Sequence, residues 1–204
     1  MAILKSGATS DQLTIDPTSK AARVTLYGSD GSYNGEKATY RASTIIPLVA
    51  AVTVNVPFFN IIGSASKTIT VKRIRVSGMT LTAVGYFTIN CEKLSTASTG
   101  GTSTTPPCVP LDSNDPAASA VVKAYAVAPT KGALVGTVAS YRSLWQATTA
   151  AAAGLAPGHI FNFGDMPETK GIRLRGATQE LALTFPVALA TAGTLAIDIE
   201  WTEE

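Results

Sequence analysis

The stretch KTITVKRIRVSGMTLTAVGYFTINC, residues 67–91, decides the fold of this chain. From Met79 onward every odd position is small or apolar, and the even positions are mostly polar. Alternation with a period of two is typical of a strand that buries one face. We therefore predict two strands joined by a tight turn at Ser77 and Gly78, with a bend or bulge at Gly85, where no side chain resists it.

The first half of this stretch changes phase. Ile69 and Val71 share one face, but the next apolar pair, at positions 74 and 76, has the opposite parity. Two interpretations are open. Either a β-bulge adds a residue near Lys72 and Arg73, or the strand passes from one sheet of a sandwich to the other.

Lys72, Arg73 and Arg75 form a compact basic group in this β region. One interpretation is a solvated outer face, and the other is a docking contact for an acidic partner surface. The chain also ends in an acidic strand, which carries Asp198, Glu200, Glu203 and Glu204. If copies pack around an axis or dock on an acidic shell, we expect these charges to meet opposite ones, and to set orientation and association rate more than affinity.

Composition favours a component of an assembly. Charged residues make up 15% of the 204 residues, against roughly 25% in typical soluble proteins, and a surface poor in charge suits a chain that neighbouring subunits cover. The net charge of +2 does not indicate a nucleic-acid binder. Residues 1–75 hold nine Lys/Arg against four Asp/Glu, whereas residues 76–204 hold seven against ten, which favours contacts between copies.

The sequence predicts neither a membrane span nor a secretory signal. The most apolar run, residues 45–52, is interrupted by Pro47 and is shorter than the 18 or so residues of a span, and residues 1–12 contain no apolar signal region. Cys91 lies on the apolar parity of its strand, so we expect a buried thiol without a disulfide. A bridge between Cys91 and Cys108 is the alternative.

The remaining patterns predict an all-β chain. Short strands are expected at residues 22–27, 36–46, 52–58, 160–163, 172–175, 181–189 and 195–201. Residues 92–118 are predicted to form a long surface loop. Asp115-Pro116 is typical of the start of a helix. The pattern of residues 117–126 fits either a helix or a strand. We predict an antiparallel β-sandwich, jelly-roll-like, over residues 41–204, with an extended N-terminal arm over residues 1–40. One core should contain Phe87, Ile89, Leu183, Phe185, Ile197 and Ile199.

The search for catalytic chemistry predicts no enzyme, no metal site, no cofactor and no small-molecule substrate. The sole histidine, His159, follows Pro157-Gly158 and is expected in a loop. Asp165 and Glu168 flank a turn and are expected to cap it or to be solvated. Two tryptophans could stack on a glycan. Trp201 falls on the apolar positions of its strand, so we expect it in the core. Trp145 could contact either a glycan or a neighbouring subunit.

Three segments resemble virion proteins of tailed bacteriophages. They are LTIDPTSKAARVTLYGSDG (13–31), FFNIIGSASKTITVKRIRVSG (58–78), and GIRLRGATQELALTF with LAIDIEWTEE (171–185 and 195–204). The resemblance is to capsid decoration (cement) proteins and other head-surface proteins with a jelly-roll body. It implies a structural role on the virion, at the capsid surface, after synthesis in the bacterial cytoplasm.

The resemblance and the composition together predict a decoration protein that bridges neighbouring subunits of the phage major capsid protein. We expect a homotrimer whose N-terminal arm contacts the capsid or a neighbouring copy. The predicted contact residues are Leu13, Ile15, Arg23, Lys72, Arg73, Arg75 and Trp145. The alternative function is a receptor- or glycan-binding module of a phage tail or fibre.

Overall fold

The computed structural model describes residues 37–49, 52–80, 83–145, 158–164 and 170–204, together with two short strands nearer the N-terminus. The chain divides into two compact units, Met1–Lys37 and Ala38–Glu204. In the first unit, β1 (Thr14–Ile15) pairs antiparallel with β2 (Ala22–Arg23). The second unit begins with β3, so residues 38–40, which the sequence places in the arm, belong to a sheet.

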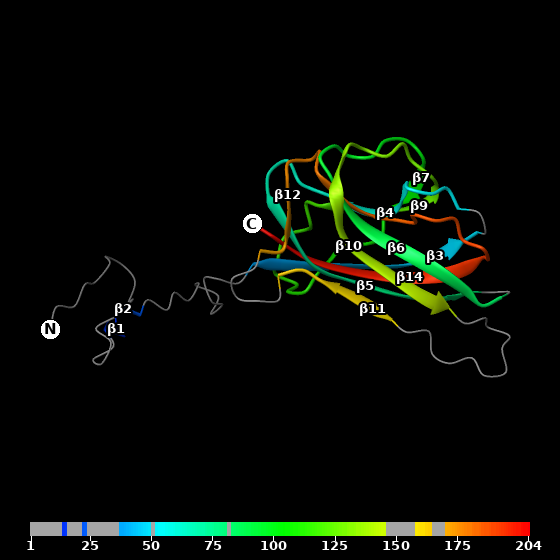
Figure 1. The fold of residues 1–204 in the computed structure, drawn as a ribbon. Helices are drawn as coiled ribbons and strands as arrows, with labels where there is room; N and C mark the ends of the chain where they lie inside the picture. The colour runs from blue at the N-terminus through cyan, green and yellow to red at the C-terminus, as the bar shows by residue number, and fades with distance from the viewer. Residues whose placement is uncertain are drawn as a thin grey trace. The chain divides into compact units, whose positions relative to one another are not determined.

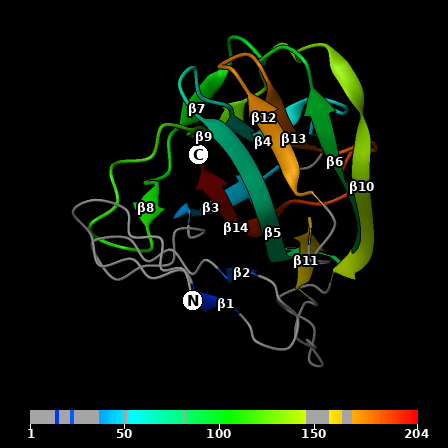
Figure 2. The same ribbon diagram turned by 90° about the vertical axis from the view of Figure 1, so that its left-hand side faces the viewer.

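The second unit consists of two antiparallel sheets (Figures 1 and 2). The first sheet has the order β11 (His159–Asn162), β5 (Thr68–Thr80), β14 (Gly193–Glu203), β3 (Ala38–Leu48) and β8 (Val109–Pro110). A further strand, β12 (Ile172–Arg175), pairs with another part of β5. The second sheet has the order β10 (Leu134–Trp145), β6 (Gly85–Leu94), β13 (Glu180–Thr184), β4 (Pro57–Ile62), β9 (Val121–Val127) and β7 (Thr102–Thr104).

The strands from β3 to β6 alternate between the sheets, as in a jelly-roll topology. The chain passes from β3 in the first sheet to β4 in the second, back to β5, and again to β6. Late in the chain, β13 enters the second sheet between β4 and β6, and β14 enters the first between β3 and β5. The predicted antiparallel β-sandwich is therefore confirmed. No helix in the described ranges is long and apolar enough to cross a membrane.

The predicted hairpin turn at Ser77 and Gly78 is wrong. The strand β5 continues through both residues, which lie opposite Ala196 and Leu195 of β14. The next strand, β6, begins at Gly85, and β5 and β6 belong to different sheets. A local Ser-Gly turn signal is overridden because the long β14 strand offers a continuous ladder of backbone partners.

The phase change within β5 is a β-bulge. Arg73 lies opposite Glu200 and Val71 lies opposite Trp201, so Lys72 is the extra residue. The bulge turns the side chains of Ile69, Val71, Ile74 and Val76 to the same buried face. Of the two interpretations of the sequence, the bulge is confirmed.

The predicted core is confirmed. Phe87, Ile89, Leu183, Phe185, Ile197 and Ile199 are all buried in one cluster. Trp201 is also fully buried, as its parity predicted, and its ring stacks on Tyr40 with a centroid distance of 5.8 Å. Its burial removes Trp201 as a platform for a glycan.

The predicted helix start at Asp115-Pro116 is not found. Residues 116–119 have no regular structure, and the following segment forms β9, whose Val122 and Ala124 lie opposite Ile61 and Phe59 of β4. The β-branched residues of β9 suit a pleated strand. The sequence left a helix or a strand open for residues 117–126, and pairing with β4 favours the strand.

Buried carboxylates attach the polar segments before and after β9 to the sandwich. Ser98 donates hydrogen bonds from its backbone N (2.6 Å) and its Oγ (3.0 Å) to Glu180, which is fully buried. Lys131, beyond β9, forms an ion pair with Glu92 at 2.6 Å. The segment before β9 also contributes β7 and β8, so the prediction of one irregular loop over residues 92–118 is only partly correct.

His159 is not a loop residue, contrary to the prediction. It begins β11 opposite Val76, and its ring stacks on Tyr141 of β10 at a centroid distance of 4.0 Å. Burial lowers the pKa of His159 below its usual value, so the imidazole is neutral at physiological pH.

Both cysteines are free thiols, as the sequence favoured, but they differ in burial. Burial, with the charge of Glu92, raises the pKa of the Cys91 thiol, and burial also raises the pKa of Cys108, which is only partly covered. Since the exposed thiolate is the reactive form, we expect a disulfide reagent to label Cys108 in the native protein and Cys91 only on unfolding. A Cys108→Ser variant that still labels readily under native conditions would contradict the burial of Cys91.

Candidate functional site

The structure brings together only part of the predicted contact set. Arg73 and Arg75 project from the outer face of β5, whereas Lys72 is at the bulge and half-buried. Leu13 lies outside the described residues. Ile15 and Arg23 are in β1 and β2 of the first unit, and Trp145 is the last residue of β10. The structure does not describe the side chains of these three residues.

The outer face of the first sheet carries a charged cluster that we call the arginine face: Arg41, Arg73, Arg75, Ile160, Asp198 and Glu200. Its centre is the Glu200 carboxylate. Arg41 donates to Glu200 Oε2 from Nε at 2.8 Å and from Nη2 at 2.7 Å, and Arg73 donates to the same oxygen from Nη2 at 2.8 Å. Strand pairing sets this geometry, because Glu200 of β14 lies opposite Arg41 of β3 and Arg73 of β5.

The two guanidinium groups control the protonation of Glu200. Burial acts to raise the pKa of this carboxyl, but the hydrogen bonds and charges of Arg41 and Arg73 outweigh it and hold the pKa below its usual value. Glu200 is therefore ionised at neutral pH, and the two arginines are held in fixed positions. Since both arginine side chains are exposed, the pairs contribute orientation more than stability.

Arg75 differs from its two neighbours on this face. Asp198 lies opposite it on β14 and Ile160 lies opposite it on β11, yet the exposed Arg75 side chain makes no ion pair with any described residue. A hollow of about 190 Å³ is bordered by these residues and the Arg41–Glu200–Arg73 cluster. The face thus presents a guanidinium beside an aliphatic side chain, a combination that suits a carboxylate on a partner surface.

Most of the acidic residues near the C-terminus are paired within the chain. Besides Glu200, Glu203 lies 3.4 Å from Lys67 Nζ, and Glu204 lies 3.9 Å from Arg173. Glu200 and Glu203 therefore already have basic partners within the chain, and a contact of these acids with another copy stays a prediction. Strand pairing within the chain brings these opposite charges together before any contact with another copy is made.

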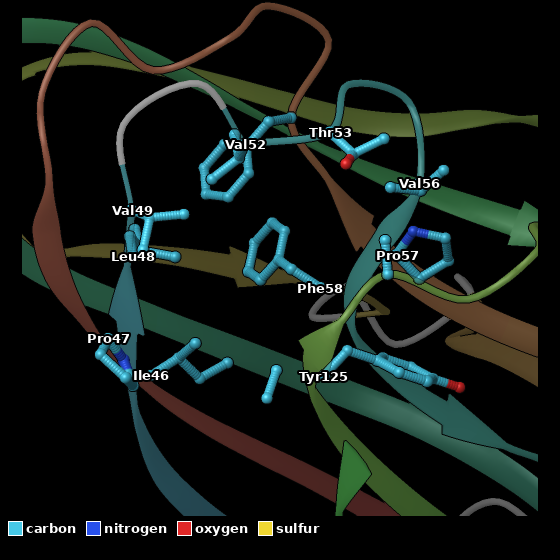
Figure 3. Close-up of a pocket in the computed structure, with 13 residues that line it drawn as sticks. Ile46, Pro47, Leu48, Val49, Val52, Thr53, Val56, Pro57, Phe58 and Tyr125 are labelled. Atoms are coloured by element: carbon cyan, nitrogen blue, oxygen red, sulfur yellow. The ribbon is translucent and has the colours of Figure 1, made fainter. Parts of the chain in front are cut away.

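An apolar pocket of about 200 Å³ is the second candidate site, at the ends of β3, β4 and β9 (Figure 3). Among the described residues, no charged side chain lines it; the lining residues are Ile46, Pro47, Leu48, Val49, Val52, Thr53, Val56, Pro57, Phe58, Tyr125, Ala126, Ala128 and Phe185. The Phe58 ring lies between the end of β3 and Val56-Pro57 in Figure 3, and stacks on Phe185 at 4.2 Å. The Tyr125 hydroxyl accepts a hydrogen bond from Asn60 Nδ2. The described lining of the pocket therefore suits an apolar group.

Sequence reasoning missed Arg41 and Ile160. Arg41 alternates with the buried Tyr40 and Ala42, so its outward direction was readable from parity. The sequence could not predict that Arg41 lies near Arg73, because their proximity depends on the position of β14 between β3 and β5. In the described part of the chain, no group of three or more His, Cys, Asp or Glu side chains is arranged to hold a metal ion.

No family model, curated protein or solved structure matches this chain.

Proposed function

We propose that this protein is a structural component of a bacteriophage virion that decorates the capsid and stabilises it by bridging neighbouring subunits of the major capsid protein. The resemblance of three segments to head-surface proteins motivates the proposal. The observation that carries it is the arginine face, where Arg75 stands beside Ile160 without an ion-pair partner among the described residues.

The mechanism is mechanical. A rigid sandwich that contacts two capsid subunits adds contacts that must break before the shell expands under the pressure of packaged DNA. Arg41 and Arg73 are immobilised on Glu200, so the docking face loses little side-chain freedom on binding. Arg75 then pairs with an acidic residue of the capsid surface, and Ile160 covers apolar surface beside it.

Charge reversal at Arg75 tests this docking face. We expect Arg75→Glu to slow association with undecorated particles by about 3- to 10-fold at low salt, because a carboxylate on the shell is then repelled. The rate for the native protein should fall as salt rises. Arg175→Glu is the matched control, since Arg175 is an exposed arginine on β12 with the same charge change. Surface plasmon resonance on immobilised particles measures both rates.

Electron microscopy of particles separates this function from the alternative. Copies spread in large numbers over the head support decoration, and a few copies at the tail support a receptor-binding module. If Arg75→Glu, Arg175→Glu and the native protein associate at equal rates, the arginine face does not take part in docking.

A further inference from the structure

One margin of the sandwich is closed by a cluster of aromatic rings. Tyr141 of β10, in the second sheet, stacks face to face on His159 of β11, in the first, with ring centroids 4.0 Å apart and an interplanar angle of 6°. Phe161 of β11 lies edge-on to both rings, and Phe87 of β6 lies edge-on to Tyr141. In Figures 1 and 2, β10 and β11 lie beside each other at this margin. The rings therefore join two strands that belong to different sheets.

Strand β11 depends on these ring contacts for its attachment. It has four residues, stands at the edge of the first sheet, and among the described strands pairs with β5 alone. His159 and Phe161 point inward, whereas Ile160 and Asn162 point outward and are exposed. A short edge strand with few buried contacts opens more easily than the core strands. Loss of the His159 contact should therefore weaken β11 more than the rest of the sheet.

The charged groups around His159 do not favour a positive imidazole. On β10, Arg142 lies over a tyrosine ring of β6, and on β5 the nearest charged residue is Arg75, which lies on the outer face. Asp198 of β14 is also on the outer face, opposite Arg75. Residues 146–158, which connect β10 to β11, contain no ionisable side chain. Among the described residues, the imidazole thus has no carboxylate partner, and the charges closest along the strands are arginines.

We propose that β11 is released by acid, because protonation of His159 breaks its stack on Tyr141 and detaches the strand from the margin of the sandwich. A charged imidazole between rings loses hydration and gains no counter-ion. Cation–π attraction to Tyr141 offsets part of this loss, but burial lowers the pKa of His159, so the loss of hydration is the larger effect. The stack therefore contributes fully above the ordinary imidazole pKa of about 6.5, and its contribution is lost as pH falls through the lowered value.

Release of β11 alters the arginine face on the outside of the sheet. Ile160 follows His159 in the strand and points the opposite way, so it lies beside Arg75 and borders the hollow of that face. When β11 detaches, Arg75 loses this aliphatic neighbour. A group that titrates on the inner side of the sheet thus controls a surface on the outer side. The release of β11 does not depend on the proposed function, and only its effect on docking rests on it.

The native protein allows a direct test, because His159 is its only histidine. The NMR shift of the imidazole Hε1 proton should titrate with a pKa below about 6.5. Hydrogen exchange, corrected for the intrinsic effect of pH, should show the protection of the β11 amides falling about threefold or more from about pH 7.5 to about pH 5. Strand β12 is the internal control, since it has the same length, pairs with β5 and contains no aromatic residue. Its protection should stay constant.

The variant His159→Phe keeps a flat ring for the stack and removes the titration. Its β11 amides should be equally protected at both pH values, and at about pH 5 it should associate with undecorated particles about threefold faster than the native protein.

Three results would each overturn the release of β11: a His159 pKa at or above about 6.5, equal pH dependence in β11 and β12, or unchanged pH dependence in His159→Phe. The first two are measured on the native protein, so they remain decisive if the variant misfolds. If β11 is released but both proteins associate at equal rates at about pH 5, the release stands and the effect of Ile160 on docking is rejected.

Discussion

Truncating Phe185 to alanine is expected to lower the free energy of unfolding by about 3–5 kcal/mol. The Phe185 side chain is 1% exposed and stacks on Phe58 with a centroid distance of 4.2 Å. Its backbone carbonyl also accepts a hydrogen bond from Asn55 N at 2.8 Å, so the residue is held in place at the end of the second sheet. Phe185 also lines the apolar pocket of about 200 Å³, so removing the ring enlarges that hollow, and the added cavity increases the cost of the lost burial.

Urea unfolding followed by tryptophan fluorescence measures this loss. Phe87→Ala should give a similar value, because Phe87 is 5% exposed and contacts Tyr141 edge-on across β6 and β10. Val187→Ala is the control, since Val187 is 66% exposed and should change stability by less than about 0.5 kcal/mol. Losses below about 1 kcal/mol at both phenylalanines would reject the assignment of these faces to the core.

Removing the Glu203 carboxylate is expected to destabilise the fold by about 3–5 kcal/mol. This fully buried side chain accepts hydrogen bonds from Ser119 N at 3.0 Å, Ser119 Oγ at 2.6 Å, Ala120 N at 3.0 Å and Trp201 Nε1 at 3.0 Å. In Glu203→Ala these donors lose their acceptor inside the protein, and each unpaired buried donor carries a desolvation cost. The carboxylate also joins β14 to the segment before β9, so its loss detaches the two.

The Glu203 effect depends on pH in a defined direction. Burial acts to raise the pKa of Glu203, but the hydrogen bonds from Ser119, Trp201 and Ala120 outweigh it and lower the pKa below its usual value. A lowered folded-state pKa stabilises the protein above the ordinary carboxyl pKa of about 4.3, and this contribution is lost as pH falls through the lowered value. The stability difference between native protein and Glu203→Ala should therefore be full at pH 7 and shrink below about pH 4.

Glu204→Gln controls for charge alone. Glu204 is exposed and lies 3.9 Å from Arg173, so its substitution should change stability by less than about 1 kcal/mol. If Glu203→Ala unfolds at the same urea concentration as Glu204→Gln at pH 7, the carboxylate does not hold the segment before β9.

Period-two patterns predicted the faces of strands well, because one buried side of a sheet leaves a local trace in the sequence. The alternation over residues 85–91 and 195–201 correctly placed Phe87, Ile89, Ile197 and Ile199 in the core. The same reasoning failed at Ser77-Gly78, where the turn signal is local but the pairing that overrides it comes from β14, more than 100 residues later.

The arginine face shows the limit of local patterns more clearly. Arg73 and Glu200 are separated by 127 residues, and Arg41 and Glu200 by 159. Nothing in the neighbourhood of any one of them specifies the others, because strand order is a property of the whole sandwich. Sequence reasoning found the basic residues of β5 and the acids of β14 separately, and only the register places them together.

The central position of β14 has a consequence for biogenesis. Its partners β3 and β5 are made early, with β3 roughly 150 residues ahead of the strand that pairs with it. During synthesis, the apolar faces of β3 and β5 therefore stay exposed until β14 is made. The edges of β3 and β5 that will pair with β14 stay unpaired over the same time. Closure over so long a loop is slow, and waiting strands of this kind are prone to aggregate. High yields in a host cell should accordingly depend on chaperones that shield the nascent chain until β14 has left the ribosome.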